Sequence, residues 1–182
     1  MSRKIIPVLV GICFLMQSAL CFADGRNLSH LYRGKDIKVF VKDIVNESEK
    51  KDLSSADFKK EVVKAFSNRR SVTFEVVTSP DDSDIEVSGV IKQYQYLVKG
   101  PMKPSLGIDT MALDMAATMT ENYADMNVNF NVTDHKTGKV LWSRDVYDYE
   151  KHKMTEAESI PVMFDKIARK FVAHSFGKPA RK

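Results

Sequence analysis

Strict alternation of apolar and amide side chains between residues 126 and 132 constrains the fold of this 182-residue chain more than any other feature. The residues in order are Met126, Asn127, Val128, Asn129, Phe130, Asn131 and Val132. Successive side chains of a β-strand point to opposite faces, so this period of two predicts a strand buried on one face and wet on the other. Residues 134–139 follow as a predicted hairpin loop, with Gly138 where a positive φ is needed. A return strand containing Trp142 and Val146 completes an antiparallel pair.

The same alternation predicts three further strands, over residues 37–45, 72–76 and 85–98. Near the end of the third strand, Tyr94 and Tyr96 are expected on the outer face of the sheet. Residues 99–109, which contain two glycines and two prolines, follow and are predicted to form a loop.

Two helices are predicted from apolar residues that recur at the helical period. The first spans about residues 55–68 and begins at a cap near Ser54. The second begins near Thr155, which forms a capping-box pattern with Glu158, and Gly177 can end it.

This order of elements predicts an α+β fold, with a largely antiparallel four- to five-stranded sheet and two helices packed on one face. A single domain is expected over residues 37–177, after a flexible lead-in at 24–36. The domain contains a Met-rich insertion at about 99–120, and a basic tail follows at 178–182.

The N-terminus has the pattern of a secretory signal peptide. Arg3 and Lys4 precede an uncharged run at residues 5–16, which is too short to span a bilayer comfortably. Small residues then allow cleavage after Ala23, so residues 1–23 are predicted to be removed. The alternative is lipidation of Cys21, which would anchor the protein to a membrane. We therefore expect a periplasmic protein, held at the outer membrane if Cys21 is acylated.

Cleavage after Ala23 would remove both cysteines, Cys13 and Cys21, so the exported part would have no thiol for catalysis, a disulfide or a thiolate metal site. A cysteine-free exported domain fits the bacterial periplasm better than a eukaryotic secretory route. Loss of Arg3 and Lys4 would leave a formal net charge of +2. So weak a positive charge argues against a nucleic-acid-binding protein.

Residues for catalysis or for a cofactor are not evident in the sequence. The four histidines lie in loops or near helix ends, outside recognised hydrolase motifs, and are interpreted as solvated; they are His30, His135, His152 and His174. The acidic group Asp81, Asp82 and Asp84 lacks the glycine and terminal glutamate of a calcium loop, which favours a solvated turn. We expect no enzymatic activity, no catalytic residues and no cofactor.

The insertion contains Met111, Met115 and Met119, whose spacing of four would stack three thioethers on one helix face. Alternation with polar and small residues also fits a strand, so helix and strand are not distinguished here. The stripe has three interpretations. It can be core packing, an adaptable apolar surface for a partner, or a soft-metal site, since thioethers bind cuprous ion.

Three stretches of the chain resemble a superfamily of small bacterial cell-envelope proteins. They are residues 37–41 followed by Asn46, residues 83–91, and residues 128–134 running into 137–143. The superfamily includes the lipoprotein that plugs the lipopolysaccharide-inserting outer-membrane barrel, the lipoprotein activators of penicillin-binding proteins, and the curli-secretion lipoproteins. The resemblance implies that this fold serves as a binding scaffold without catalytic residues.

We therefore expect a non-enzymatic envelope protein that acts as a binding or assembly scaffold for an envelope protein or a glycolipid. The expected contact surface lies in the loop and insertion; its residues are Lys99, Met102, Lys103, Met111, Met115 and Met119. The alternative function is a soft-metal or small-ligand carrier that uses the Met-rich segment.

Overall fold

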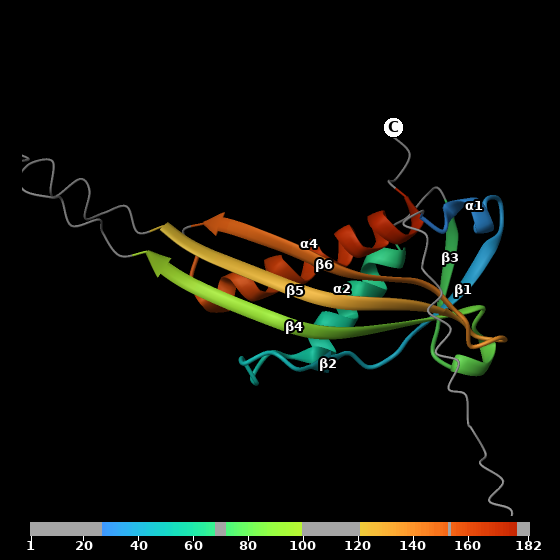
Figure 1. Cartoon of the computed structure of the whole chain (residues 1–182), viewed down its shortest axis with the longest axis horizontal. Coiled ribbons are helices and arrows are strands. Elements are labelled where there is room, and N and C mark those ends of the chain that lie inside the picture. The colour runs from blue at the N-terminus through green and yellow to red at the C-terminus, as the bar shows by residue number, and fades with distance from the viewer. Residues whose placement is uncertain (1–26, 68–71, 100–120, 153, 178–182) are drawn as a thin grey trace, which may run out of the picture.

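A computed structural model describes residues 27–67, 72–99, 121–152 and 154–177 of the chain (Figure 1). Its helices are α1 (Ser29–Tyr32), α2 (Ser55–Ser67), the short 3-10 helix η1 (Pro80–Asp82) and α4 (Glu156–Phe176). Its strands are β1 (Asp36–Val41), β2 (Val45–Asn46), β3 (Thr73–Val77), β4 (Ile85–Lys99), β5 (Glu121–Asp134) and β6 (Val140–His152).

The six strands form one sheet in the order β3-β1-β4-β5-β6, and β2 pairs with β4 beside β1. β4, β5 and β6 form an antiparallel meander, whereas β1 runs parallel to β3 and β4, and β2 runs parallel to β4. The α+β class is confirmed. The sheet is mixed and has six strands rather than four or five. The parallel part arises because α2 connects β1 to β3, and parallel neighbours need such a crossover.

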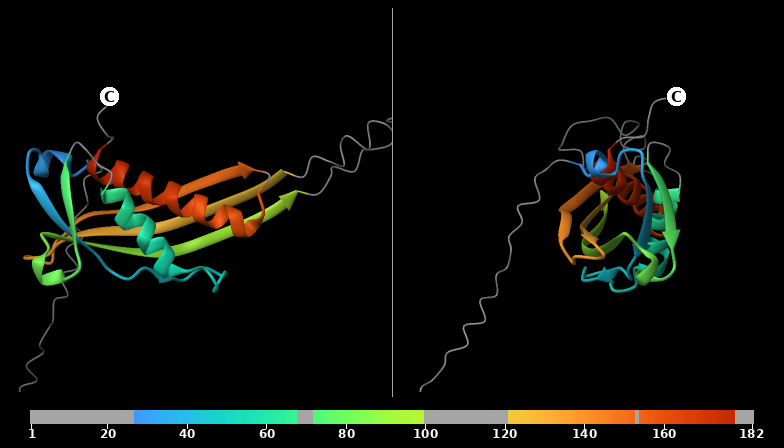
Figure 2. Two further views of the ribbon diagram at one scale, coloured as in Figure 1. Left: turned by 180° about the vertical axis from the view of Figure 1, so that it is seen from behind. Right: turned by 90° about the vertical axis from the view of Figure 1, so that its right-hand side faces the viewer.

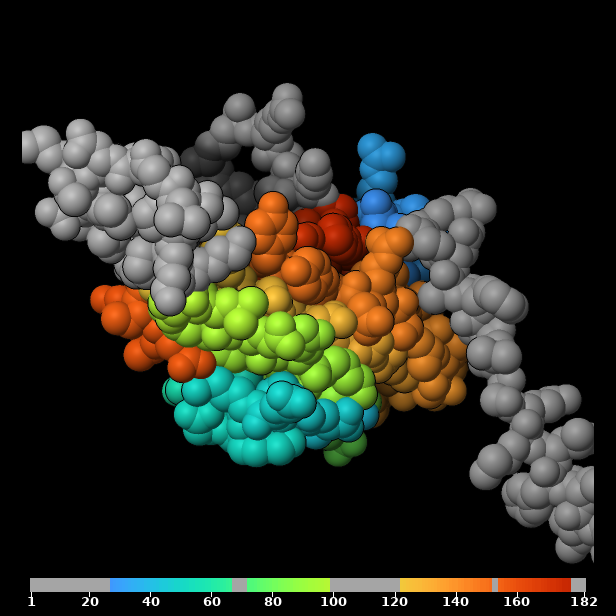
Figure 3. Space-filling model, turned by 60° about the vertical axis from the view of Figure 1, so that its left-hand side comes forward, coloured from blue at the N-terminus to red at the C-terminus, as the bar shows by residue number. Residues whose placement is uncertain are grey.

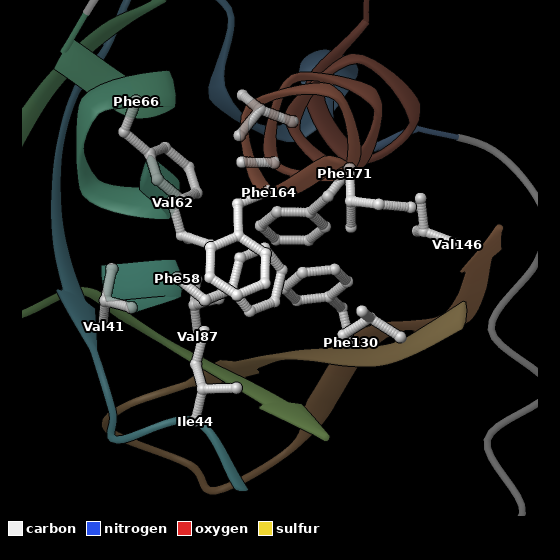
Figure 4. Close-up of a cluster of buried hydrophobic side chains, with 14 of the residues drawn as sticks. Val41, Ile44, Phe58, Val62, Phe66, Val87, Phe130, Val146, Phe164 and Phe171 are labelled. Atoms are coloured by element: carbon white, nitrogen blue, oxygen red, sulfur yellow. The ribbon is translucent and has the colours of Figure 1, made fainter. Parts of the chain in front are cut away.

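Helices α2 and α4 lie against the same face of the sheet, and their aromatic side chains form the core with those of β5 (Figures 2 and 4). Phe130 of β5 stacks on Phe171 of α4 with ring centroids 4.1 Å apart. Phe58 of α2 lies 4.8 Å from Phe164 of α4. The third helix, α1, was not predicted and lies near the C-terminal end of α4, where Leu28 donates a backbone hydrogen bond to Ser175.

Tyr94 and Tyr96 lie on the helix-covered face, so the prediction that they point outward was wrong. The reason is a β-bulge: the register with β5 shifts between Ile91 and Gln93, so that Lys92 is an extra residue. Beyond this bulge the even-numbered residues face inward. Tyr94 is buried with its hydroxyl 3.0 Å from Ser159 Oγ, and the Tyr96 hydroxyl donates to the carbonyl of Met154 at 2.8 Å.

Local signals in the predicted loops and caps are confirmed. Gly138 has a φ of 67° in the β5–β6 hairpin. Thr155 accepts a hydrogen bond from the backbone of Glu158, and the Glu158 carboxylate accepts one in return, which forms the capping box of α4.

The two ends of the described chain lie together, and the far end of the meander points away from them (Figure 1). Strands β4 and β5 run on to Lys99 and Glu121, beyond the helices that cover their other ends (Figure 2). None of the described helices is long and apolar enough to cross a bilayer.

Candidate functional site

An apolar hollow lies along the outer side of α2, next to the segment that joins β1 to β2. It has a volume of about 680 Å³ and is lined by Asp43, Ile44, Ser55, Ala56, Lys59, Lys60, Val63 and Lys64. The helical period explains its composition, because Phe58, Val62 and Phe66 turn toward the core and leave the intervening residues on the outer flank. Its volume lies in the range of ligand pockets, about 300–1,000 Å³.

A second hollow of about 460 Å³ adjoins the first and shares Lys59 and Val63 with it. Its other lining residues lie at the C-terminal ends of β1 and β3, namely Phe40, Val41, Val76, Val77 and Thr78. The Lys59 ammonium lies 5.9 Å from the centroid of the Phe40 ring, within reach of a cation–π contact. We call the two hollows together the α2 groove.

Lysines surround the α2 groove, and each has a carboxylate partner. Lys59 bonds Asp43 at 2.8 Å, Lys60 bonds Asp57 at 2.7 Å, and Lys64 bonds Glu61 at 3.0 Å. The hydrogen bond from Lys59 lowers the pKa of Asp43, and that from Lys60 lowers the pKa of Asp57, so both carboxylates are charged at neutral pH. Exposed pairs of this kind contribute little to stability, so a partner's anionic group can compete for the lysines.

The residues predicted to contact a partner are not among the described residues that line this groove. Met102, Lys103, Met111, Met115 and Met119 lie outside the described residues, as does Cys21, and Lys99 is the last residue of β4. The prediction of their roles, the soft-metal alternative included, is therefore untested.

The end of β4 exposes two large apolar side chains in succession. Leu97 is 56% exposed and Val98 is 59% exposed. Because consecutive strand residues point to opposite faces, both faces of β4 are apolar where it leads into the insertion.

Two of the histidines lie within hydrogen-bonding distance of a partner, and a third has a lowered pKa. His30 Nδ1 lies 2.8 Å from the carbonyl of Asn27, and burial lowers the pKa of His174 near the end of α4. His135 is half-buried rather than solvated, with Nδ1 2.9 Å from Glu86 Oε1, and this contact ties the β5–β6 hairpin to β4. The Glu86 pKa is lowered first by a hydrogen bond from Lys42 and then by His135. Glu86 thus has a structural role.

The acidic group Asp81, Asp82 and Asp84 also has a structural role. Asp81 and Asp82 belong to η1, and the Asp84 carboxylate accepts a hydrogen bond from the backbone of Lys38 at 3.0 Å. Within the described residues, no group of three or more His, Cys, Asp and Glu side chains is placed to hold a metal ion.

The α2 groove was not predicted from the sequence. Its lining comes from three separate segments, and the helical pattern at residues 55–68 identified only which side of α2 is buried. The one available signal was the group of lysines at 59, 60 and 64 beside the exposed flank of that helix.

The fold and the groove together describe an α+β protein with an open, lysine-rimmed surface hollow. No family model matches the chain, and neither does any curated protein. Among solved structures, the chain is similar to a PelC dodecamer subunit from Paraburkholderia phytofirmans, with 14% identity and a TM-score of 0.48 over 74% of this chain and 88% of that one. A hypothetical protein from Chlamydia trachomatis gives 10% identity and a TM-score of 0.48 over 78% and 96%.

A minor lipoprotein from Acinetobacter baumannii is similar at 11% identity and a TM-score of 0.41, over 79% of this chain and 94% of that one. Likeness at this level does not assign a function to the chain, because unrelated functions share folds.

Proposed function

We propose that this chain is a non-enzymatic protein of the bacterial cell envelope, which acts as a scaffold by binding an envelope partner in the α2 groove. The observation that carries the proposal is the combination of an apolar floor with three lysines at its rim. Ile44 is buried beneath the groove and Val63 is half-buried along it, so a partner's apolar groups have surface to cover. The lysines would then meet acidic groups on the partner.

The envelope address is proposed from the N-terminal sequence alone. Mass spectrometry of the mature N-terminus tests it directly. A free Asp24 is expected after cleavage behind Ala23, whereas an acylated Cys21 would establish a lipid anchor. A chain that keeps Met1 in the cell would contradict export.

The groove is tested by reversing charge at its rim. The double variant Lys60→Glu with Lys64→Glu changes two exposed lysines that are part of no core contact. The matched control reverses Lys136 and Lys139, two exposed residues of the β5–β6 hairpin. In a pull-down from envelope extract, partners should be lost with the groove variant and kept with the control. Partners retained equally by both variants would rule out the α2 groove.

The insertion remains a second proposed contact surface on the same scaffold. Its support is that β4 and β5, the strands that flank it in sequence, end at Lys99 and Glu121 away from residues 27 and 177, and that β4 exposes Leu97 and Val98 just before its end (Figure 1). Deletion of residues 100–120 should then remove a different set of partners from the one that the groove variant removes. Unchanged partners after the deletion would reject this surface, Lys103 and the three methionines included.

A further inference from the structure

The face of the meander opposite α2 and α4 has no described element over it. In Figure 1 the two helices pass behind the strands, and Figure 3 shows β4, β5 and β6 side by side at the surface. The pairing register places the outward side chains in four rows across these strands. The rows are Ser88–Asn131–Ser143, Val90–Asn129–Asp145, Gln93–Asn127–Tyr147 and Gln95–Asp125–Tyr149. We call these rows the outer strip.

The outer strip has an unusual charge composition for this protein. Charged residues make up 29% of the chain, and lysine and arginine together number 28. These four rows contain no cation, and their charged members are Asp125 and Asp145; the next row on the same face, Leu97–Tyr123–Lys151, contains a lysine. Neither carboxylate forms an ion pair within the described residues. Asp145 accepts a hydrogen bond from Asn129 Nδ2 at 2.8 Å, and burial raises the pKa of Asp125.

Two of the asparagine side chains in the strip are held by hydrogen bonds to neighbouring side chains of the strip. Asn131 Nδ2 donates to Asn129 Oδ1 at 3.2 Å, and Asn129 in turn bonds Asp145, so a chain of hydrogen bonds crosses the strip. Asn127 Oδ1, in the next row, is buried and has no hydrogen-bond partner among the described residues. An unpaired buried acceptor is costly, and a ligand hydroxyl that displaced the neighbouring side chains could satisfy it.

Two tyrosines border the amides on β6. Tyr147 is 50% exposed and Tyr149 is 62% exposed, and both present an aromatic ring beside hydrogen-bonding groups. Tyrosine combines apolar contact area with a polar hydroxyl, which suits a ligand that has both CH and OH groups on its surface.

We propose that the outer strip binds an uncharged glycan chain, laid along β5 with its hydroxyls on the amides and its sugar rings against Tyr147 and Tyr149. Primary amides donate and accept at once, as hydroxyls do, and those of Asn127, Asn129 and Asn131 repeat every ~7 Å along the strand. Charge complementarity selects the class of glycan, because Asp125 and Asp145, which form no ion pair with a described residue, repel carboxylate or sulfate groups. This site is on the opposite side of the sheet from the helices and does not depend on the α2 groove.

The test uses the exported form of the protein and hexasaccharides of glucose, of N-acetylglucosamine and of galacturonic acid. Amide chemical shifts of β4, β5 and β6 are followed by NMR during titration. At least one uncharged hexasaccharide should shift the strip residues, with at least tenfold weaker binding of the anionic one. Absence of binding by both uncharged probes, or equal binding of the anionic probe, would overturn the proposal.

Variants then locate the site. Tyr147→Ala with Tyr149→Ala should weaken binding at least tenfold, and Asn129→Asp, which keeps side-chain shape, should also weaken it. The groove variant Lys60→Glu with Lys64→Glu serves as the control and should bind the glycan as the unmodified protein does. Unchanged affinity in both strip variants would contradict the site. Because the two sites have separate variants, loss of one proposal leaves the other standing.

Discussion

The Tyr94 hydroxyl is a buried polar atom whose hydrogen bond to Ser159 joins β4 to α4. Ser159 Oγ separately donates to the carbonyl of Glu156, so removal of the tyrosine hydroxyl breaks one bond and leaves the serine donor paired. Tyr94→Phe should therefore lower the free energy of unfolding by about 1 kcal/mol. Urea denaturation measures this, and Tyr149→Phe on the exposed face is the control, expected within about 0.5 kcal/mol of the unmodified protein. Equal values for the two variants would show that the Tyr94 bond contributes nothing.

Tyr32 gives the protein a specific alkaline sensitivity. Burial raises the pKa of Tyr32 to about 12, with smaller contributions from the carboxylates of Asp134 and Asp84. An unfolded tyrosine titrates near pH 10, so the folded state holds this proton more tightly than the unfolded state does. The stability that Tyr32 contributes is complete below about pH 10 and is lost as pH rises toward about 12. In Tyr32→Phe, the loss of unfolding free energy over this window should be shallower. Parallel pH profiles for the two proteins would contradict the assignment.

Within strand β4, Gly89 allows the Phe130 ring to lie directly against the backbone. A Cβ at this position would meet Phe130 Cε1 at 3.1 Å and Cδ1 at 3.3 Å. The ring has little room to withdraw, because it is stacked on Phe171. Gly89→Ala should destabilise the protein by about 1–3 kcal/mol, as overpacked cores do. Thermal unfolding measures the effect, with Ser88→Ala on the outer strip as the control. A stability gain in Gly89→Ala, as expected where only chain entropy changes, would show that the ring moves freely.

Sequence patterns located the elements well where the signal is local. Helix α2 lies at Ser55–Ser67 against a predicted 55–68, and the capping box marks the start of α4. Sequence patterns failed where the existence of a strand, or the direction of its side chains, depends on pairing with a strand that is distant in sequence. β2 has only two residues and exists through its pairing with Val90 and Ile91. The bulge at Lys92 is visible only in the pairing with β5, and it reverses the facing of Tyr94 and Tyr96.

The candidate surfaces belong to the whole molecule, which is why the sequence alone did not predict them. The alternation at residues 126–132 predicted that the asparagines face water. It did not predict that Gln93, Asp145 and Tyr147 would join them, because that depends on the register of three strands. The α2 groove likewise needs β1, β3 and α2 to be assembled before Lys59 lies over Phe40.

The arrangement of the core also determines how the molecule unfolds. The single tryptophan, Trp142 of β6, is buried with its ring 5.6 Å from that of Phe171, and Phe171 also contacts Phe66 of α2 and Phe130 of β5. One side chain thus connects both long helices to the meander. Phe171→Ala should cost about 3–5 kcal/mol and move the tryptophan fluorescence and far-ultraviolet circular dichroism transitions together. Leu31→Ala, at an exposed position of α1, should move neither.

If the fluorescence and circular dichroism transitions of Phe171→Ala occurred at different urea concentrations, the helices and the meander would unfold independently of each other. The outer strip would then keep its shape when the helices unfold. Coincident transitions are expected instead, because the inner face of the meander is buried only where α2 and α4 cover it, and an isolated three-stranded sheet would expose Met126, Val128 and Phe130 to water. The glycan-binding face proposed above therefore depends on the aromatic core behind it, and Phe171→Ala should lose glycan binding at the same urea concentration at which its tryptophan becomes exposed.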